Sequence, residues 1–282
     1  MSAISKGKGN PRIGTILRTK FENTPTSPTN RHQKRKAVVI DCEMVTVSSG
    51  RRHIASIGAV DFLTGEVLLN HHVYPEMRIV NYNTRYSGIN HASMMAAVNS
   101  GVALRGWEGA RQALWEHVDK DTVLIGHALQ NDLATIGVIH SRVVDSQILT
   151  GEAIFPTLPV VDSLPRLTGL KGLTSELVGY EIQTGRKGHT ALEDAYATRD
   201  VIIWCLRNPG LLDDWAVREK KQYEEYKKQQ KEKREQKKKK DAAKGSAAAV
   251  ATDPVKPLQT NNSDECGRER GSDIAEGSGP SP

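Results

Sequence analysis

Cysteine is scarce in this sequence: three residues, Cys42, Cys205 and Cys266, are spread over 282 positions. Their odd number and wide spacing match neither a disulfide framework nor the paired ligands of a zinc site. The sequence therefore predicts a protein of a reducing compartment that has no structural disulfides or zinc.

Long apolar runs are also missing. No stretch is apolar over the roughly 18 residues that a membrane-spanning helix requires, and the polar opening MSAISKGKGNPRIG has no signal-peptide core. We therefore expect no membrane partner. Hydrophobic residues make up 38% of the chain, which is enough for a core but low for a chain folded from end to end, so part of it is expected to be unfolded.

Positive charge is concentrated near the two ends. Residues 1–36 hold nine Lys or Arg and one acid, residues 217–240 hold twelve and five, and residues 37–216 hold fourteen and twenty. Lys and Arg gain affinity for nucleic acid by releasing condensed counterions, so the basic flanks predict a polyanionic partner; a solubilising tail is the alternative. The runs HQKRK and KKKK also fit import into the nucleus or nucleolus, with the cytoplasm and the mitochondrion as alternatives.

Composition divides the chain into four segments. Residues 1–35 mix Ser, Thr, Pro, Gly and basic residues without apolar periodicity, which predicts a disordered basic segment. One globular domain is expected over residues 36–210. A charged basic helix, stable or transient, is expected over residues 211–240, because good helix formers there lack an apolar stripe. A disordered tail is expected over residues 241–282.

The order of local patterns indicates the fold class. Three strand-like runs, AVVIDCEMV, HIASIGAVDF and EVLLNHHVY, come first. Helical spacing follows from Leu104 to Val118, and TVLIG is then typical of a buried strand. The next patterns are helix-like LQNDLATIG, strand-like VVDSQI, and helix-like LKGLTSELVG and TALEDAYATRDVIIWCLR. Strands first and then alternating strands and helices predict an α/β domain with a mixed sheet flanked by helices.

Two acids lie two residues apart at the expected end of the first strand. Because side chains alternate along a strand, Asp41 and Glu43 are expected on one face, with Cys42 packed into the core on the other. An Asp-x-Glu pair at a strand end is also typical of a solvated surface, so the pair needs further evidence.

Two later blocks provide further acids. Asp132 lies near the start of the helix expected after TVLIG, where a lone Asp is also typical of a helix cap. In GHTALEDAYATRDV, Thr190 and Glu193 fit a capping box, which places Asp194 in the first turn of a helix. The neighbours of Asp194 at helical spacing are uncharged, so its side chain is expected to point inward. His189 then lies just outside the helix, beside that turn.

The chemistry of this set of side chains indicates cations. Four carboxylates brought together repel one another and hold protons unless cations neutralise them. Oxygen-rich sites suit Mg²⁺ or Mn²⁺ rather than zinc. In phosphoryl transfer, two cations about 3.5–4 Å apart stabilise the attacking and leaving oxygens. The attacking water also needs a base whose pKa lies near the operating pH, and histidine meets that need.

These blocks carry a resemblance. Asp41-x-Glu43, His127-x4-Asp132 and His189-x4-Asp194 resemble the three sequence blocks of the DEDDh 3′-to-5′ exonucleases. More narrowly, VVIDCEMV, YNTRYSGIN, GHALQNDL and LKGLTSELVGYEIQTGRKGHTALEDAYAT resemble the RNA-exonuclease branch that includes yeast ribosomal-RNA exonucleases and the interferon-induced antiviral exonuclease. The resemblance implies a ribonuclease H-like fold and a site that binds two divalent cations, Mg²⁺ or Mn²⁺.

The resemblance also implies a role for each catalytic position. Asp41 is expected to bridge both metal ions, Glu43 and Asp194 to complete the first metal site, and Asp132 to support the second largely through water. His189 is expected to be the general base.

Further positions are implied to bind substrate. The backbone at Met44, the side chain of Arg85 and the ring of His127 are expected to hold the terminal nucleotide, whose free 3′-hydroxyl lies against Glu43. Arg85 suits a phosphate because its planar guanidinium donates two parallel hydrogen bonds. Without the resemblance, Arg85 is typical of a surface residue.

The family commonly has glycine after the DCEMV block, where this chain has Thr46, and the change is expected to alter close approach of substrate to the backbone. Asp145 matches another aspartate-containing block of the family and is expected to be structural.

The resemblance predicts a hydrolase that removes nucleotides from RNA with a free 3′-hydroxyl and releases nucleoside 5′-monophosphates, in ribosomal or other structured-RNA processing. A DNA exonuclease is the first alternative, because no residue of the sequence settles which sugar is bound. An inactive nucleic-acid-binding module is the second. Such a module is expected to have lost a catalytic residue, whereas this chain has all five. Which proteins bind this chain cannot be read from the sequence.

Overall fold

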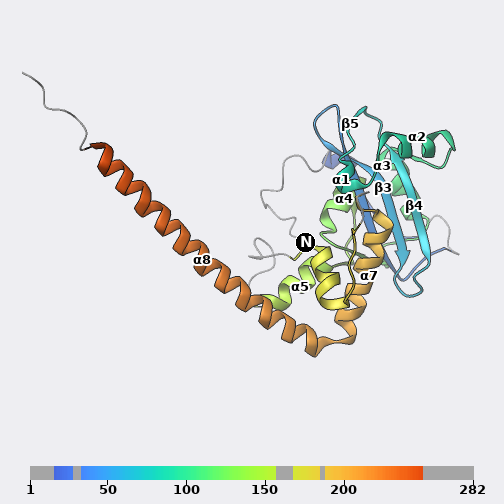
Figure 1. Ribbon diagram of the computed structural model, residues 1–282. Helices are drawn as coiled ribbons and strands as arrows, with labels where there is room; N and C mark the ends of the chain where they lie inside the picture. Colours follow the sequence, from blue (N-terminus) through green and yellow to red (C-terminus); the bar gives the residue numbers. More distant parts are fainter. Residues whose placement is uncertain (1–15, 28–32, 157–167, 185–187, 250–282) are drawn as a thin grey trace, which may run out of the picture. The chain divides into compact units, whose positions relative to one another are not determined.

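A computed structural model describes residues 16–27, 33–156, 168–184 and 188–249 (Figure 1). The chain divides into two compact units, Met1–Lys228 and Gln229–Pro282. The first unit is built on a seven-stranded sheet. Its strands are β2 (Ala37–Val47), β3 (Arg52–Asp61), β4 (Val67–Tyr74), β5 (Ile79–Asn81), β6 (Leu104–Arg105), β7 (Val123–Gly126) and β9 (Val143–Asp145).

The sheet is mixed. Its strand order is β6-β4-β3-β2-β7-β9, and β5 pairs with the end of β2. β2, β3 and β4 form antiparallel pairs, whereas β7 runs parallel to both β2 and β9. The predicted α/β class with a mixed sheet is therefore confirmed.

Helices cover both faces of the sheet (Figure 1). The helical elements are α1 (Thr84–Ser87), α2 (His91–Asn99), α3 (Gly106–Trp115), α4 (Gln130–Ile136), α5 (Ser146–Ile154), α6 (Leu170–Leu173), a π-helical turn (Thr174–Val178), α7 (Ala191–Arg207) and α8 (Pro209–Ala249). On one face, Val38 and Ile40 belong to the core that includes Leu114 of α3. On the other, Val39 belongs to the core that includes Ile202 of α7. Since strand residues alternate, the odd-numbered positions of β2 that follow Val39 face α7.

Three helices differ from the sequence-based prediction. α1 was not predicted, because it is a single turn of four residues. α2 was not predicted, because it buries only Met94 and Ala97 and so lacks a broad apolar stripe. The prediction of a strand over VVDSQI is wrong beyond Asp145, where the strand ends and α5 begins. The Asp145 side chain caps α5 by accepting a hydrogen bond from Gln147 N at 2.9 Å. A capping aspartate changes the backbone direction in a way that the apolar pattern does not reveal.

Part of the N-terminal segment is folded. Within it, residues 18–20 form a 3₁₀ turn, and β1 (Glu22–Asn23) pairs in parallel with β8 (Val138–Ile139). The predicted disorder over residues 1–35 is therefore wrong for residues 16–27, while residues 1–15 and 28–32 lie outside the described part of the chain.

Arg111 of α3 anchors this segment. Its guanidinium lies 4.8 Å from the ring centroids of both Trp107 and Trp115. It donates to Lys20 O at 2.9 Å and pairs with Glu22 Oε1 at 2.6 Å. Because the anchor lies about 90 residues along the chain, the composition of the segment alone does not reveal that it folds.

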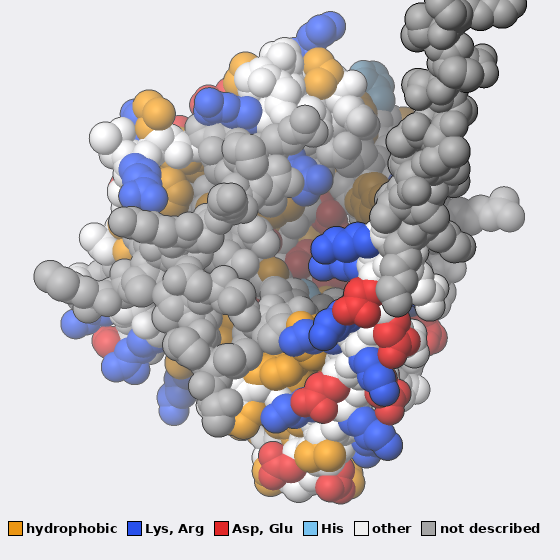
Figure 2. Space-filling view, turned by 90° about the vertical axis from the view of Figure 1, so that its left-hand side faces the viewer, with side chains coloured by type: hydrophobic (Ala, Val, Ile, Leu, Met, Phe, Trp, Pro, Cys, Tyr) orange, Lys and Arg blue, Asp and Glu red, His pale blue; other side chains and the backbone are white. Residues whose placement is uncertain are grey.

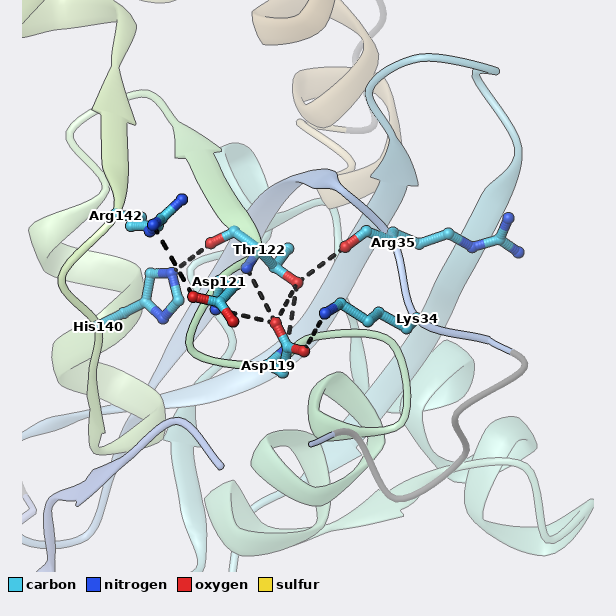
Figure 3. A network of polar contacts seen from close by, with 7 residues as sticks. All are labelled: Lys34, Arg35, Asp119, Asp121, Thr122, His140 and Arg142. Atoms are coloured by element: carbon cyan, nitrogen blue, oxygen red, sulfur yellow. Dashed lines mark hydrogen bonds and ion pairs between the residues drawn. The ribbon is translucent and has the colours of Figure 1, made fainter. Parts of the chain in front are cut away.

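A polar network links the approaches to β2 and β7 (Figure 3). The buried Asp119 carboxylate forms an ion pair with Lys34 and accepts from Thr122 N at 3.1 Å. Thr122 Oγ1 donates to Arg35 O at 2.8 Å, and His140 Nε2 contacts Thr122 O at 2.7 Å. Burial acts to raise the pKa of Asp119, but Lys34 and nearby backbone N–H groups outweigh it and hold that pKa below its usual range. The network lies at the amino ends of β2 and β7, so it stabilises the pairing of these two strands where they begin.

The first turns of α8 belong to the core of the first unit. Trp215 and Ala216 are buried there, and Trp215 Nε1 donates to Glu176 Oε2 at 2.8 Å. The core therefore extends past the expected boundary at residue 210. Residues 241–249, expected in a disordered tail, are helical, and residues 250–282 lie outside the described chain.

Farther along α8, exposed side chains carry both signs of charge. Figure 2 shows acidic and basic side chains interspersed on this helix, without a stripe of one sign. Among the described residues, no helix has the combination of length and apolar character that crossing a membrane requires.

Candidate active site

Strand β2 carries the first two acids, Asp41 and Glu43. The strand does not end at these residues, as the sequence suggested, but continues to Val47 with a change of register against β3 between Glu43 and Met44. Both acids occupy positions on the α7 side of the sheet, and Cys42 between them is buried, as predicted. The central strand therefore directs two carboxylates at the start of α7.

Asp132 approaches β2 from α4. Its side chain is 4% exposed, and its Oδ1 accepts a hydrogen bond from Cys42 N at 3.0 Å. On β2, backbone pairing with β7 covers only Ala37–Val39. Farther along the strand, the Asp132 carboxylate accepts the hydrogen bond of a backbone N–H group that β7 does not pair with. This hydrogen bond holds a third carboxylate beside Asp41 and Glu43.

The turn between β7 and α4 is ordered by Asp145. Its two carboxylate oxygens accept from Ala128 N at 3.0 Å and Leu129 N at 2.8 Å. Ala128 has a φ of 54°, a left-handed conformation that these hydrogen bonds support. Asp145 therefore has the structural role expected for it, and it fixes the turn that presents His127.

His127 lies at the same turn. Its Nδ1 contacts Ser146 Oγ at 2.9 Å. Burial lowers the pKa of His127, and the nearby Asp145 carboxylate opposes that effect only in part. The ring is therefore held in place and favoured in its neutral form.

Helix α7 brings Asp194 to the same region. Thr190 Oγ1 accepts from Glu193 N at 3.2 Å, so Thr190 is the N-cap as predicted. Asp194 is 5% exposed and points inward, also as predicted. Its Oδ2 lies 3.2 Å from His189 Nδ1. The N-cap at Thr190 therefore fixes the position of the Asp194 carboxylate relative to His189.

Gln183 is a further contact of Asp194 that the sequence did not indicate. Its Nε2 lies 3.1 Å from each carboxylate oxygen of Asp194. No local pattern marks Gln183, because the contact joins residues eleven positions apart.

A glycine lets α7 approach the sheet. Gly58 of β3 pairs with Asp41 of β2. A Cβ atom at Gly58 would lie 2.5 Å from the backbone carbon of Ala191, closer than packed atoms allow. The first turn of α7 therefore lies against the sheet directly beside the Asp41 position.

The carboxylates strongly affect one another. Burial raises the pKa of Glu43 to about 8, with Asp194 and Asp132 adding to the shift. Burial also raises the pKa of Asp132 to about 8, although the hydrogen bond from Cys42 N opposes it. The pKa of Asp41 is well above its usual range, because of burial and then the charges of its three carboxylate neighbours. Burial raises the pKa of Asp194 too, against the contacts of Gln183 and His189.

This arrangement fits divalent cations. Ligand atoms of Glu43, His189 and Asp194 lie within 4.8 Å of one another. Oxygen-rich donors of this kind suit hard cations such as Mg²⁺. Burial, and for Asp41 and Glu43 also the neighbouring carboxylates, raises these pKa values, and a bound cation would supply the counter-charge that favours the ionised form.

A cavity of about 180 Å³ adjoins the carboxylates. Met44 and His127, two of the residues expected to hold a nucleotide, border it, and Arg52 and Asn131 border it without having been predicted. Its full lining is Asp41, Cys42, Met44, Arg52, His127, Ala128, Asn131 and Asp132. A larger cavity of about 540 Å³, beside Tyr74 and Arg105, contains none of the predicted site residues.

Arg85, the third residue expected to hold a nucleotide, belongs to α1. It is an exposed residue of α1 and does not line the 180 Å³ cavity. α1 does contact the histidine segment, because Tyr86 O accepts a hydrogen bond from His189 N at 2.8 Å. Of the three residues expected to hold a nucleotide, Met44 and His127 therefore border the cavity and Arg85 does not.

Residues 38–202 match the exonuclease family RNase_T. The chain is similar to RNA exonuclease 3 of Candida albicans, with 32% identity over 192 residues that cover 68% of this chain and 43% of that protein. It is also similar to interferon-stimulated 20 kDa exonuclease-like 2 of Homo sapiens, with 32% identity over 59% of this chain and 45% of that protein. The chain spans less than half the length of either relative.

A solved structure has a similar fold. It is a Saccharomyces cerevisiae Pan2 pseudoubiquitin hydrolase–RNA exonuclease module in complex with AAGGA RNA. The TM-score is 0.53 at 22% identity, and the match covers 69% of this chain and 33% of that one. At this identity the likeness concerns the fold.

Proposed function

Because this chain belongs to the RNase_T exonuclease family, we propose that it is a 3′-to-5′ exoribonuclease that releases nucleoside 5′-monophosphates. The resemblance to the RNA-exonuclease branch is confirmed by its relatives, and the ribonuclease H-like fold by its structural neighbour. The convergence of four carboxylates and His189 beside a cavity carries the proposal, because these groups suit hydrolysis of a phosphodiester.

In this proposal Asp41, Glu43, Asp132 and Asp194 hold two divalent cations, Mg²⁺ or Mn²⁺. When bound, such cations stabilise the negative charge that develops on the phosphate and its leaving oxygen. The chain supplies the ligands from three separate elements, β2, α4 and α7. Burial, and then the charges of Asp194 and Asp132, raises the pKa of Glu43, and a bound cation would offset these effects, which favours cation binding.

His189 is proposed as the general base. Its Nδ1 contacts Asp194 Oδ2, which leaves Nε2 to accept a proton from the attacking water. The water oxygen then bonds to phosphorus as the bond to the 3′-oxygen of the penultimate nucleotide breaks. That oxygen takes up a proton and becomes the new 3′-hydroxyl, and the terminal nucleotide leaves with a 5′-phosphate.

The terminal nucleotide is proposed to lie in the 180 Å³ cavity. Met44 and His127 border this space, and the free 3′-hydroxyl is proposed to lie against Glu43. Arg85, exposed on α1, is proposed to contact a phosphate.

RNA is favoured over DNA as the substrate because the Candida albicans relative is named RNA exonuclease 3. Processing of ribosomal or other structured RNA is the proposed setting. The predicted contribution of the basic flanks to polyanion binding, and of their basic runs to nuclear import, rests on charge alone and stays a prediction.

A substrate panel tests the function. The purified protein is incubated with matched 5′-labelled single- and double-stranded RNA and DNA in Mg²⁺ or Mn²⁺, with and without EDTA. We expect RNA to shorten stepwise from its 3′ end, nucleoside 5′-monophosphates to appear, and EDTA to stop the reaction. Internal cleavage, shortening from the 5′ end, or equal activity in EDTA would contradict the proposal, and faster loss of DNA would favour the DNA alternative.

A further inference from the structure

Thr46 makes a side-chain contact that a glycine at this position could not make. Asn83 Nδ2 donates to Thr46 Oγ1 at 3.1 Å and lies 3.5 Å from Met44 O. Thr46 is on β2, three residues beyond Glu43, and Asn83 immediately precedes α1. The contact therefore joins the strand that bears two carboxylates to α1.

Asn83 is the residue from which α1 starts. It has a φ of 50°, a left-handed conformation that asparagine tolerates better than most residues. Its backbone N–H donates to Asn81 Oδ1 at 2.8 Å, and its carbonyl accepts from Tyr86 N at 2.7 Å and Ser87 N at 3.0 Å. The position of Asn83 thus sets the position of α1.

The other side of α1 contacts the histidine segment. Tyr86 O accepts from His189 N at 2.8 Å. Gly188 has a φ of 80°, and a Cβ atom there would lie 2.4 Å from Thr84 O and 2.5 Å from Gly88 N. No space remains between α1 and the backbone of Gly188 and His189, so a shift of α1 moves that backbone.

α1 needs such contacts to keep its place. It has four residues and buries only Ser87, and a single helical turn has little stability of its own. Contacts from outside the turn therefore decide where it lies.

We propose that the Thr46–Asn83 hydrogen bond positions His189 through α1. This inference rests on the proposed function, in which His189 is the general base. Thr46 and Asn83 are positioning residues: they fix α1 to β2, and α1 in turn fixes the backbone of His189 relative to Glu43 and Asp194. A general base that is held loosely spends less time in reach of the attacking water, so kcat is expected to depend on this hydrogen bond.

The test replaces the hydroxyl of Thr46 and keeps its shape. Thr46→Val is expected to lower kcat by about three- to tenfold, the range that corresponds to the loss of one such hydrogen bond, while KM and the affinity for Mn²⁺ measured by calorimetry change less than about twofold. Thr46→Ser should restore kcat. Thr64→Val is the matched control, because Thr64 is exposed on the turn between β3 and β4 and accepts only from Glu66 N.

Asn83→Gly provides a second variant, because glycine tolerates the left-handed backbone and lacks the amide. Because Asn83→Gly also removes the contact with Met44 O, its effect should be at least as large as that of Thr46→Val, and the double variant should be no worse than Asn83→Gly alone. Additive losses, an unchanged kcat in Thr46→Val, or failure of Thr46→Ser to restore it would overturn the inference.

Hydrogen exchange separates this inference from the proposed function. The His189 amide, bonded to Tyr86 O, should exchange at least about threefold faster in Thr46→Val and at the wild-type rate in Thr46→Ser and Thr64→Val. This readout applies even if the wild-type protein hydrolyses none of the substrates, an outcome that would contradict the function alone. An unchanged exchange rate in Thr46→Val would contradict the proposal that the Thr46–Asn83 hydrogen bond positions His189.

Discussion

Asp41→Asn should lower RNA hydrolysis by at least about 10²–10³-fold in Mg²⁺ or Mn²⁺, a loss typical of removing one strong electrostatic contribution to a transition state. Asp41 is the acid whose pKa is affected by all three other carboxylates as well as by burial. An amide keeps the size of the side chain but binds a divalent cation more weakly than a carboxylate does. The measurement is the single-turnover rate on a short 5′-labelled RNA.

The same substitution should not harm the fold. Without divalent cations, a neutral side chain removes repulsion among buried carboxylates, so the midpoint of thermal unfolding should be equal to or higher than that of the wild type. Asp121→Asn is the matched control, since Asp121 is exposed and lies at the amino end of β7. If Asp41→Asn retained more than about a tenth of the wild-type rate, the proposed role of Asp41 would be wrong.

His189→Ala should lower kcat by about 10²–10⁴-fold, the usual contribution of a general base. The contact between His189 Nδ1 and Asp194 Oδ2 at 3.2 Å orients the ring, and loss of the ring leaves the attacking water without a proton acceptor. The remaining activity should also lose the pH dependence that a titrating base gives to kcat. Rates are measured across pH at saturating RNA, with His72→Ala on β4 as the control.

His189 also lies near enough to Glu43 and Asp194 to be a metal ligand. The two roles predict different results. A general base can be removed with less than about a threefold change in Mn²⁺ affinity, whereas loss of a ligand weakens metal binding by about 10–100-fold or more. Unchanged kcat in His189→Ala, or a loss of activity that high Mn²⁺ restores, would count against the general base.

Much of the site followed from local patterns. Alternation along a strand placed Asp41 and Glu43 on one face, and the capping signal at Thr190 placed Asp194 inside the first turn of α7. Both inferences depend on periods of a few residues, over which backbone geometry dictates side-chain direction.

The contacts that the sequence did not reveal join distant segments. Gln183 contacts Asp194 from eleven positions away in the chain, and Arg52 and Asn131 meet at the cavity from β3 and α4. Their side chains are common at surfaces, so their types carry no local signal. The folded part of the N-terminal segment depends in the same way on Arg111, which no pattern within residues 16–27 anticipates.

The raised pKa values of the buried acids make the stability of the folded protein depend on pH. The pKa of Glu43 rises from 4.5 to about 8 and that of Asp132 from 3.8 to about 8 in the folded protein without metal. Between about pH 4 and pH 8 the folded state therefore binds more protons than the unfolded state, and stability falls as pH rises. Cations that bind the folded state restore stability, and they do so more strongly at high pH because fewer protons must be displaced.

Thermal unfolding of the full chain at pH 6 and pH 8, with EDTA or with saturating Mg²⁺, tests whether the four carboxylates form a cation site. We predict that the midpoint in EDTA is lower at pH 8 than at pH 6, that Mg²⁺ raises it, and that the rise is larger at pH 8. Asp41→Asn should reduce the rise at both pH values. A midpoint that Mg²⁺ leaves unchanged at pH 8, or raises equally in the wild type and in Asp41→Asn, would contradict the account.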